Sequence, residues 1–407
     1  MTPSVLGSVT LGYELVWNPK RHCSGVRLFV DAHSHSAVDA RHLVTALSEL
    51  WPTSAPTLIL QVRSATLLRG LLDHNTPHGI WLEVAGHHLH DAAMQASVRK
   101  AHARGLPLVW SGEAGEAPQG ALQNQFHKTL RALTPQEALA ALRLSLQPQT
   151  SHGASPVLAG SIYEGLASPA LLDHALDRQG VWAVAGWPTD EVLHAHRLKQ
   201  IQPSRQLLRA LIAAIEEDVS LEALEHHMGD EPLLVYRFLR YANSAHLGAR
   251  SEVTSLRQGL MVMGYSKLRA WLMEQIPQSS VDPNLEPIRC AMVLRARIME
   301  RLADAGIEDA LRHEVFLCGI LSQLDMLLGE PLGAAIHRLP LPGRIASAVV
   351  GESGPYAPWL AVASALESSN TRMVREVCRA HRMPADAVNR ALLQTLGTLR
   401  SQAVCSV

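Results

Sequence analysis

The sequence contains no paired cysteines, no long apolar run and no excess of charge of either sign. Its 5 cysteines are an odd number, and none of them stands in a CxxC pair. This pattern predicts free thiols in a reducing compartment rather than a disulfide framework. No apolar stretch reaches the roughly 18 residues that a membrane-spanning helix needs, and no signal peptide is expected in residues 1–30. We therefore expect a cytoplasmic protein with no membrane partner.

Charge is balanced along the chain. The 407 residues carry 36 Lys and Arg against 37 Asp and Glu, and the balance holds in each half. Neither half has the basic composition of a nucleic-acid-binding protein, so no nucleic-acid partner is expected. The 21 histidines form no HExxH motif, so surface or capping roles are predicted for them, with no metal and no other cofactor.

The first half alternates short β-branched runs with helical stretches. Strands are expected at residues 8–17, 25–30, 57–62, 79–84, 106–110, 126–133, 155–160 and 181–187. Helices are expected between them, at residues 38–50, 65–72, 90–104, 135–146 and 168–179. Strand–helix alternation of this kind predicts an α/β domain built on a parallel sheet or barrel.

The second half has helical patterns throughout, from residue 204 to residue 399. Its most ordered stretch is residues 233–264, where Leu234, Phe238 and Ala242 form one apolar stripe and Ser255 with Gln258 forms a capping box. The change of period predicts three parts: an α/β domain over residues 1–187, a linker helix over 188–202 and an all-α domain over 203–407.

The second half resembles the HDOD domain, a bacterial signalling module related to HD-type phosphohydrolases. The resemblance rests on "LRYANSAHLG", "VTSLRQGLMVMGYSKLR" and "FLCGILSQLDMLL", and it extends over residues 200–407. HD hydrolases bind metal through a His–Asp pair, but the matching place here reads Leu321-Ser322-Gln323-Leu324, and Arg289–Cys290 lies where the first histidine is expected. Neither Ser nor Gln can replace an imidazole and a bridging carboxylate.

The first half resembles the EAL domain, a (β/α) barrel that hydrolyses cyclic di-GMP. The resemblance rests on "LGYELVW", "IWLEV", "GLPLVW" and "VWAVAGWP". A full barrel usually needs about 200–250 residues, so a reduced, degenerate barrel, trimmed or open, is predicted here. EAL followed by HDOD is a known bacterial arrangement, which the two resemblances together imply.

The EAL resemblance implies a site for two divalent cations that this sequence retains only in part. Glu14 and Glu83 stand at two of the family's glutamates, and Lys128 at its lysine. The other expected ligands are replaced, at Gln61, Ser111, Gly112, Leu130, Gly160 and Ala185. Two carboxylates cannot hold two cations. We therefore expect no catalytic residue, no metal and no enzyme activity, although Glu14 and Glu83 are also explained as carboxylates that are solvated or paired with a base.

The leading hypothesis is a non-catalytic signal-transduction or scaffold protein. It would act through protein–protein interactions, with other signalling proteins or with itself, and regulate a bacterial process such as motility, stress response or virulence. The alternative is a sensor that binds cyclic di-GMP without hydrolysing it, and a residual phosphodiesterase is the weakest reading. We expect weak or no binding of cyclic di-GMP.

Candidate interaction residues lie in the ordered stretch of the second half. Arg240, Asn243 and Arg257 are polar positions that either form an exposed cluster or satisfy backbone groups at helix ends. A stacking platform for a nucleotide would use Trp17, Trp110 and Trp187, which core packing explains equally well.

Overall fold

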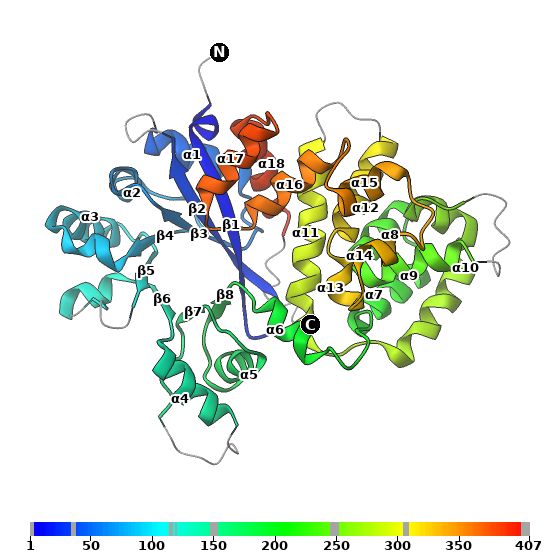
Figure 1. The fold of residues 1–407 in the computed structure, drawn as a ribbon. Helices are drawn as coiled ribbons and strands as arrows, with labels where there is room; N and C mark the ends of the chain where they lie inside the picture. The colour runs from blue at the N-terminus through cyan, green and yellow to red at the C-terminus, as the bar shows by residue number, and fades with distance from the viewer. Residues whose placement is uncertain are drawn as a thin grey trace. The chain divides into compact units, whose positions relative to one another are not determined.

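The structure is a computed structural model that describes residues 4–33, 38–113, 117–118, 120–146, 154–244, 252–303 and 309–399. The chain forms two compact units (Figure 1). The barrel unit contains residues 1–191 and 365–407, and the helical unit contains residues 192–364. No helix in the described ranges is long and apolar enough to cross a membrane.

Eight strands close into a barrel in chain order. They are β1 (Val9–Trp17), β2 (Cys23–Ala32), β3 (Thr57–Val62), β4 (Ile80–Ala85), β5 (Leu108–Gly112), β6 (Lys128–Ala132), β7 (Ile162–Glu164) and β8 (Ala183–Ala185). β1 runs antiparallel to both β2 and β8, and the remaining neighbours are parallel. The predicted α/β barrel is confirmed, but the expectation of an open barrel is wrong.

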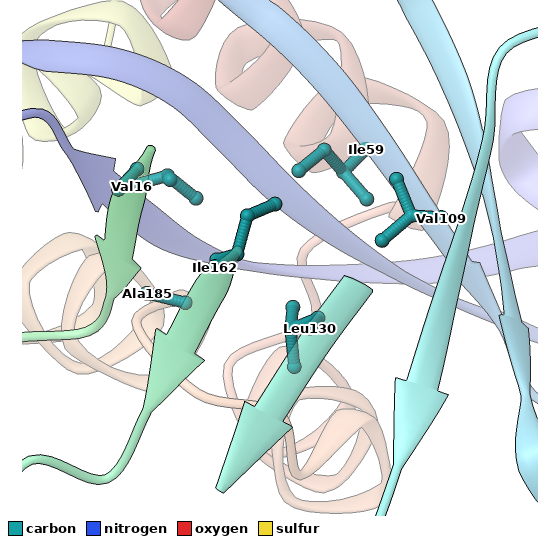
Figure 2. Packing of buried hydrophobic residues seen from close by; sticks show 7 residues of the cluster. Val16, Ile59, Val109, Leu130, Ile162 and Ala185 are labelled. Atoms are coloured by element: carbon teal, nitrogen blue, oxygen red, sulfur yellow. The ribbon is translucent and has the colours of Figure 1, made fainter. Parts of the chain in front are cut away.

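An apolar layer fills the interior of the barrel. Its side chains are Val16, Ile59, Val109, Leu130, Ile162, Ala183 and Ala185, all at most 2% exposed. Figure 2 shows six of them projecting from β1, β3, β5, β6, β7 and β8 toward one another. Successive residues of a strand point to opposite faces. On the parallel strands the residue two positions further along therefore also faces the interior, one layer above, and on antiparallel β1 the residue two positions earlier does so.

Helices follow most strands of the barrel, as predicted. They are α1 (Ala40–Leu50), α2 (Ala65–Leu72), α3 (Ala92–Ala103), α4 (Pro135–Ser145), α5 (Pro169–Asp173) and α6 (Thr189–Ala195). Thr134 and Glu137 form a capping box at α4. The strand expected at 155–160 is wrong, because β7 begins at Ile162.

Two C-terminal helices, α17 (Thr371–Ala380) and α18 (Ala385–Gly397), belong to the barrel unit (Figure 1). The sequence predicted that both helices belong to the all-α domain over residues 203–407. The structure instead groups residues 365–407 with the barrel, so the predicted boundary is wrong at this end. β8 pairs with Val16 and Trp17 of β1, and in the described structure no strand pairs with residues 9–15 along that edge. The Asn389 amide covers this edge: it accepts from the Leu11 N–H and donates to the carbonyl oxygens of Leu6 and Val9.

The helical unit contains α7 (Arg205–Glu216), α8 (Leu221–Gly229), α9 (Pro232–Ala242), α10 (Leu256–Gln275), α11 (Glu286–Ala303), α12 (Asp309–Leu321), α13 (Leu324–Leu328), α14 (Leu332–Ile336) and α15 (Gly343–Gly351). α16 (Ala357–Leu366) crosses the boundary, because the barrel unit resumes at Ala365. Gly264 breaks α10 with a φ of 69°, so two predicted helices meet there. Where the structure describes this unit, strand pairing is limited to a single bridge between Ser204 and Ser280, which confirms the all-α prediction.

Candidate functional site

A charged cluster lies directly above the apolar layer of the barrel. It consists of Glu14 on β1, Arg27 on β2, Glu83 on β4 and Glu164 on β7. Glu164 follows Ile162 of the apolar layer by two residues, which places it on the interior face. The cluster is therefore built by strands that are distant in sequence and neighbours only in the closed barrel.

Arg27 is the centre of this charged cluster. Its Nε and Nη2 atoms donate to both carboxylate oxygens of Glu83, at 2.7 and 2.6 Å. Its Nη1 atom donates to Glu164 at 2.6 Å and to Glu14 at 3.4 Å. The side chains of Arg27 and Glu83 are 10% and 1% exposed, whereas those of Glu14 and Glu164 are 31% and 37% exposed. The cluster is thus buried from solvent at Glu83 and accessible to solvent at Glu14 and Glu164.

The electrostatics of the cluster follow from one cation facing three carboxyl groups. Burial would lower the pKa of Arg27, but Glu83, Glu164 and Glu14 outweigh burial and raise it. Burial raises the pKa of Glu14, and the charges of Glu164 and Glu83 add to this effect against the opposing charge of Arg27. The cluster therefore keeps a permanent positive charge at its centre and an excess of acidic groups around it.

Sequence reasoning missed two members of this cluster. It did not consider Arg27, which faces the interior from β2, the first strand of the parallel set. It placed Gly160 at the late glutamate position, but Gly160 lies outside the strands and Glu164 ends β7. The error came from the wrong strand at 155–160. The alternation Ile162-Tyr163-Glu164 before Gly165 was the signal that could have identified the correct strand.

The other predicted replacements lie at different depths of the barrel. Gln61 is half-buried and pairs in register with Glu83, on the neighbouring strand. Ser111 is buried and Gly112 half-buried at the end of β5. Leu130 and Ala185 belong to the apolar layer itself. None of these residues adds a charge to the cluster.

Lys128 stands at the first position of β6, below the apolar layer. Its ammonium lies 5.7 Å from the ring centroid of Trp182, and Trp182 packs against Trp81 with 5.3 Å between ring centroids. The structure therefore places Lys128 at the opposite end of the barrel from the charged cluster, where it makes a cation–π contact. The structure does not bring Lys128 together with Glu14 and Glu83.

The three tryptophans considered as a stacking platform are mostly buried. Trp17 is 2% exposed and Trp110 is 0% exposed. Trp17 meets Trp187 edge to face, with 6.1 Å between ring centroids. Core packing accounts for Trp17 and Trp110, and neither offers a free face to a base.

The described residues offer no metal site. In those parts of the chain no group of three or more His, Cys, Asp or Glu side chains has an arrangement that could hold an ion. At the charged cluster, the carboxylate oxygens that would be ligands are hydrogen-bonded to Arg27 instead. The residues present therefore do not fit a pair of divalent cations.

In the helical unit, the residues compared above with the metal ligands of HD hydrolases form hydrogen bonds and ion pairs with their neighbours. Arg289 is 2% exposed and its Nε lies 3.0 Å from Oε2 of Glu231, which is 0% exposed. The Gln323 amide oxygen accepts from the guanidinium of Arg295, at 3.1 and 3.2 Å, in its favoured orientation. The Ser322 hydroxyl donates to the Gly319 carbonyl at 2.7 Å.

The three candidate interaction residues have different surroundings. The Asn243 amide donates to the carbonyl oxygens of Leu239 and Val253 and accepts from the Val253 N–H, each at 2.8 Å. Asn243 therefore joins the end of α9 to the chain that enters α10. Of the two alternatives for this residue, the contacts support a role at a helix end and not membership of an exposed polar cluster. Arg240 and Arg257 are both exposed. The Arg240 guanidinium lies 5.7 Å from the Tyr236 ring centroid.

Arg257 lies near a pocket of about 160 Å³ in the helical unit. The polar and aromatic lining residues include Glu225, His226, Arg297, Glu300, His313 and Phe316. Burial raises the pKa of Glu225 and of Glu300, while burial and the charge of Arg297 lower the pKa of His226. His313 lies 3.5 Å from Glu225, and Arg297 lies 2.7 Å from Asp230. Acidic and basic groups contact one another here, so the lining selects no class of ligand.

Comparison with known proteins matches parts of the chain. Residues 202–328 match the model of the HDOD domain. The chain is 22% identical over 159 residues to the uncharacterized protein YuxH of Bacillus subtilis, covering 38% of each chain. It is 22% identical over 181 residues to the cyclic di-GMP phosphodiesterase CdgJ of Vibrio cholerae, covering 44% of this chain and 42% of that one. The chain thus matches about two fifths of the length of these curated relatives.

Solved structures resemble the chain over less than half of its length. The response regulator MmoQ of Methylococcus capsulatus has a TM-score of 0.38 at 16% identity, covering 47% of this chain and 98% of that one. BlrP1 of Klebsiella pneumoniae, solved with manganese and cyclic di-GMP, has a TM-score of 0.30 at 11% identity, covering 44% and 55%. These scores are too low to carry an argument, so the fold rests on the strand order and the HDOD match.

Proposed function

We propose that this protein is a non-catalytic member of cyclic di-GMP signalling that acts through contacts with other proteins. The observation that carries the proposal is the position of Arg27. A guanidinium fills the space among Glu14, Glu83 and Glu164 and uses both oxygens of Glu83. The relatives support the signalling context, since one of them is a cyclic di-GMP phosphodiesterase and the HDOD model matches the helical unit.

The physical argument against hydrolysis is electrostatic. Two-metal hydrolysis needs two divalent cations about 3.5–4 Å apart, each held by oxygen ligands. Arg27 cannot lose its proton in a protein, and its Nη1 and Nη2 atoms lie 2.6 Å from carboxylate oxygens of Glu164 and Glu83. A cation at this position would be repelled by the guanidinium and would have to break its hydrogen bonds. The cluster therefore supports a barrel without a metal-activated water.

The same charges oppose the alternative function, a sensor of cyclic di-GMP. Its two phosphates are anionic, and the solvent-exposed members of the cluster are Glu14 and Glu164. Like charges at a binding surface weaken association. We expect a dissociation constant weaker than roughly tens of micromolar, or no binding.

The interaction surface is assigned to the helical unit, at Arg240 and Arg257. Both side chains are exposed, and arginine is enriched among residues that anchor interfaces. Other signalling proteins, or a second copy of this chain, are the proposed partners. Asn243 is left out of this surface, because its amide is fully engaged with the backbone.

The test is a hydrolysis assay on the full chain, with Mg²⁺ or Mn²⁺ and the Vibrio cholerae relative as the active control. We expect no linear dinucleotide from this protein and no heat of binding for cyclic di-GMP in calorimetry. Turnover that is lost in Glu83→Gln would overturn the proposal in favour of an enzyme. Sub-micromolar binding without turnover would overturn it in favour of the sensor.

A further inference from the structure

The chain that enters the helical unit is held by side chains before its first long helix begins. We call residues 196–204 the connector. The His196 ring lies 2.8 Å from Asp282, and the Ser280 N–H donates to the Pro203 carbonyl at 2.8 Å. The side-chain amide oxygen of Gln202 accepts from Arg237 at 2.8 Å. This segment is therefore held largely by long-range contacts, which include the bridge between Ser204 and Ser280.

The innermost contacts of the connector go to the buried Glu231–Arg289 pair. The Ser204 N–H donates to Oε2 of Glu231 at 2.9 Å. The Nη2 atom of Arg289 donates to the Gln202 carbonyl at 2.7 Å. Glu231 immediately precedes α9 and Arg289 lies within α11. One ion pair thus connects the backbone of the connector to two helices of the unit.

Burying the two charges of this ion pair costs desolvation free energy. Glu231 is 0% exposed and Arg289 is 2% exposed, and Oε1 of Glu231 has no hydrogen-bond partner among the described residues. Burial raises the pKa of Glu231, which reflects the cost of its charge. An apolar pair of similar volume commonly gives equal or greater stability than a buried ion pair. What an apolar pair cannot do is bind the Ser204 N–H and the Gln202 carbonyl.

We propose that the Glu231–Arg289 pair is a latch that fixes the connector to the helical unit. With the latch closed, the chain leading from the barrel unit is anchored at residue 202. With the latch open, the backbone of residues 202 and 204 loses these two partners, and the connector keeps its contacts with Asp282, Ser280 and Arg237. The latch therefore sets how firmly the connector is held to α9 and α11.

The experiment compares hydrogen exchange in the full chain between wild type and the double variant Glu231→Leu/Arg289→Met. The double variant removes the latch and leaves an apolar pair, so the helical unit should stay folded. We expect exchange in a peptide covering residues 196–205 to become at least tenfold faster. Peptides from α9 and α11 should exchange at the wild-type rate. The matched control is Arg269→Met, which breaks the exposed Arg269–Glu216 pair of the same unit (47% and 53% exposed) and should leave the connector unchanged.

Two outcomes overturn the latch. Unchanged exchange in the connector of the double variant means that the pair does not hold it. Faster exchange in α9 and α11 to the same extent as in the connector means that the pair stabilises the core instead. The single variant Arg289→Met adds a second measurement, because it leaves Glu231 buried and alone. We expect it to lower the melting temperature as well as to free the connector, whereas the double variant should only free the connector.

Discussion

The two units each contain a buried Arg–Glu pair, and the pairs differ in what surrounds them. In the barrel, Arg27 and Glu83 are 10% and 1% exposed, but Arg27 also reaches Glu14 and Glu164, which face solvent. In the helical unit, the side chains of Arg289 and Glu231 are 3% and 0% exposed, and they bond to backbone groups of residues 202 and 204. Arg289 also lies 3.7 Å from the carboxylate of Glu286. The barrel pair shares its arginine with two solvent-facing carboxylates, whereas the helical pair bonds to the backbone of the connector.

The difference shows that a buried charge has to be interpreted through its remaining partners. Burial alone would treat the two pairs as equivalent, since both contain a fully buried glutamate. The distinction lies in the remaining partners: two solvent-facing carboxylates beside Arg27, and the connector backbone beside Glu231 and Arg289. The predictions below test this distinction, from the largest expected effect to the smallest.

The largest effect is expected from Arg27→Met. This change leaves Glu83, whose side chain is 1% exposed, without its cation. Removing one member of a buried pair typically costs 3–5 kcal/mol, and we expect a loss of about this size in the free energy of unfolding of the barrel unit. Urea denaturation followed by circular dichroism measures it, with exposed Arg240→Met as the control. A loss below about 1 kcal/mol would contradict the role of Arg27 as the central cation.

Asn389→Ala tests whether the C-terminal helices stabilise the barrel. The change leaves the Leu11 N–H and the carbonyl oxygens of Leu6 and Val9 without their partner. Each buried group left unsatisfied costs about 1–3 kcal/mol, so we expect a loss of roughly 2–3 kcal/mol. The control on the same helix is the exposed Arg390→Ala. Amide hydrogen exchange in β1 should become faster. If exchange becomes faster only in the helical unit, the assignment of residues 365–399 to the barrel unit is wrong.

Asn243→Ala separates structure from recognition in the helical unit. The loss of three hydrogen bonds at 2.8 Å should reduce the free energy of unfolding by about 1–2 kcal/mol. Arg240→Ala and Arg257→Ala should leave unfolding within about 0.5 kcal/mol of wild type and weaken partner capture. If Asn243→Ala is as stable as wild type but loses capture, Asn243 belongs to the interaction surface after all.

The smallest effect concerns the pH dependence of Glu14. Burial raises the pKa of Glu14 in the folded state above its value in the unfolded chain. The ionised group therefore reduces stability at neutral pH, and this reduction disappears as the pH falls through the folded-state pKa. Glu14→Gln should stabilise the protein at pH 7 by less than about 1 kcal/mol, and the gain should vanish near about pH 4. Thermal unfolding at several pH values measures this, and a gain that grows toward acid pH contradicts the assignment.

The sequence alone determined the local elements of both units. Apolar spacing and capping residues predicted β3, α2 and α4 closely, because period and caps act within a few neighbouring residues. The HDOD pattern identified the helical half for the same reason: its helices are encoded by stripes and caps such as Ser255, which accepts from the Gln258 N–H. The loss of a two-metal ligand set, expected from residue types, stays a prediction.

The tertiary structure decided which of these elements meet. The direction of β1, and with it the place of Arg27 among three carboxylates, is fixed by closing the barrel. The membership of α18 is fixed by bonds between Asn389 and Leu6, 383 positions apart in the chain. The connector depends on Glu231 and Arg289, which no local pattern relates to residue 204. Such contacts arise only when distant segments are brought together, because the free energy of burying and pairing these groups belongs to the folded chain and not to any one stretch of sequence.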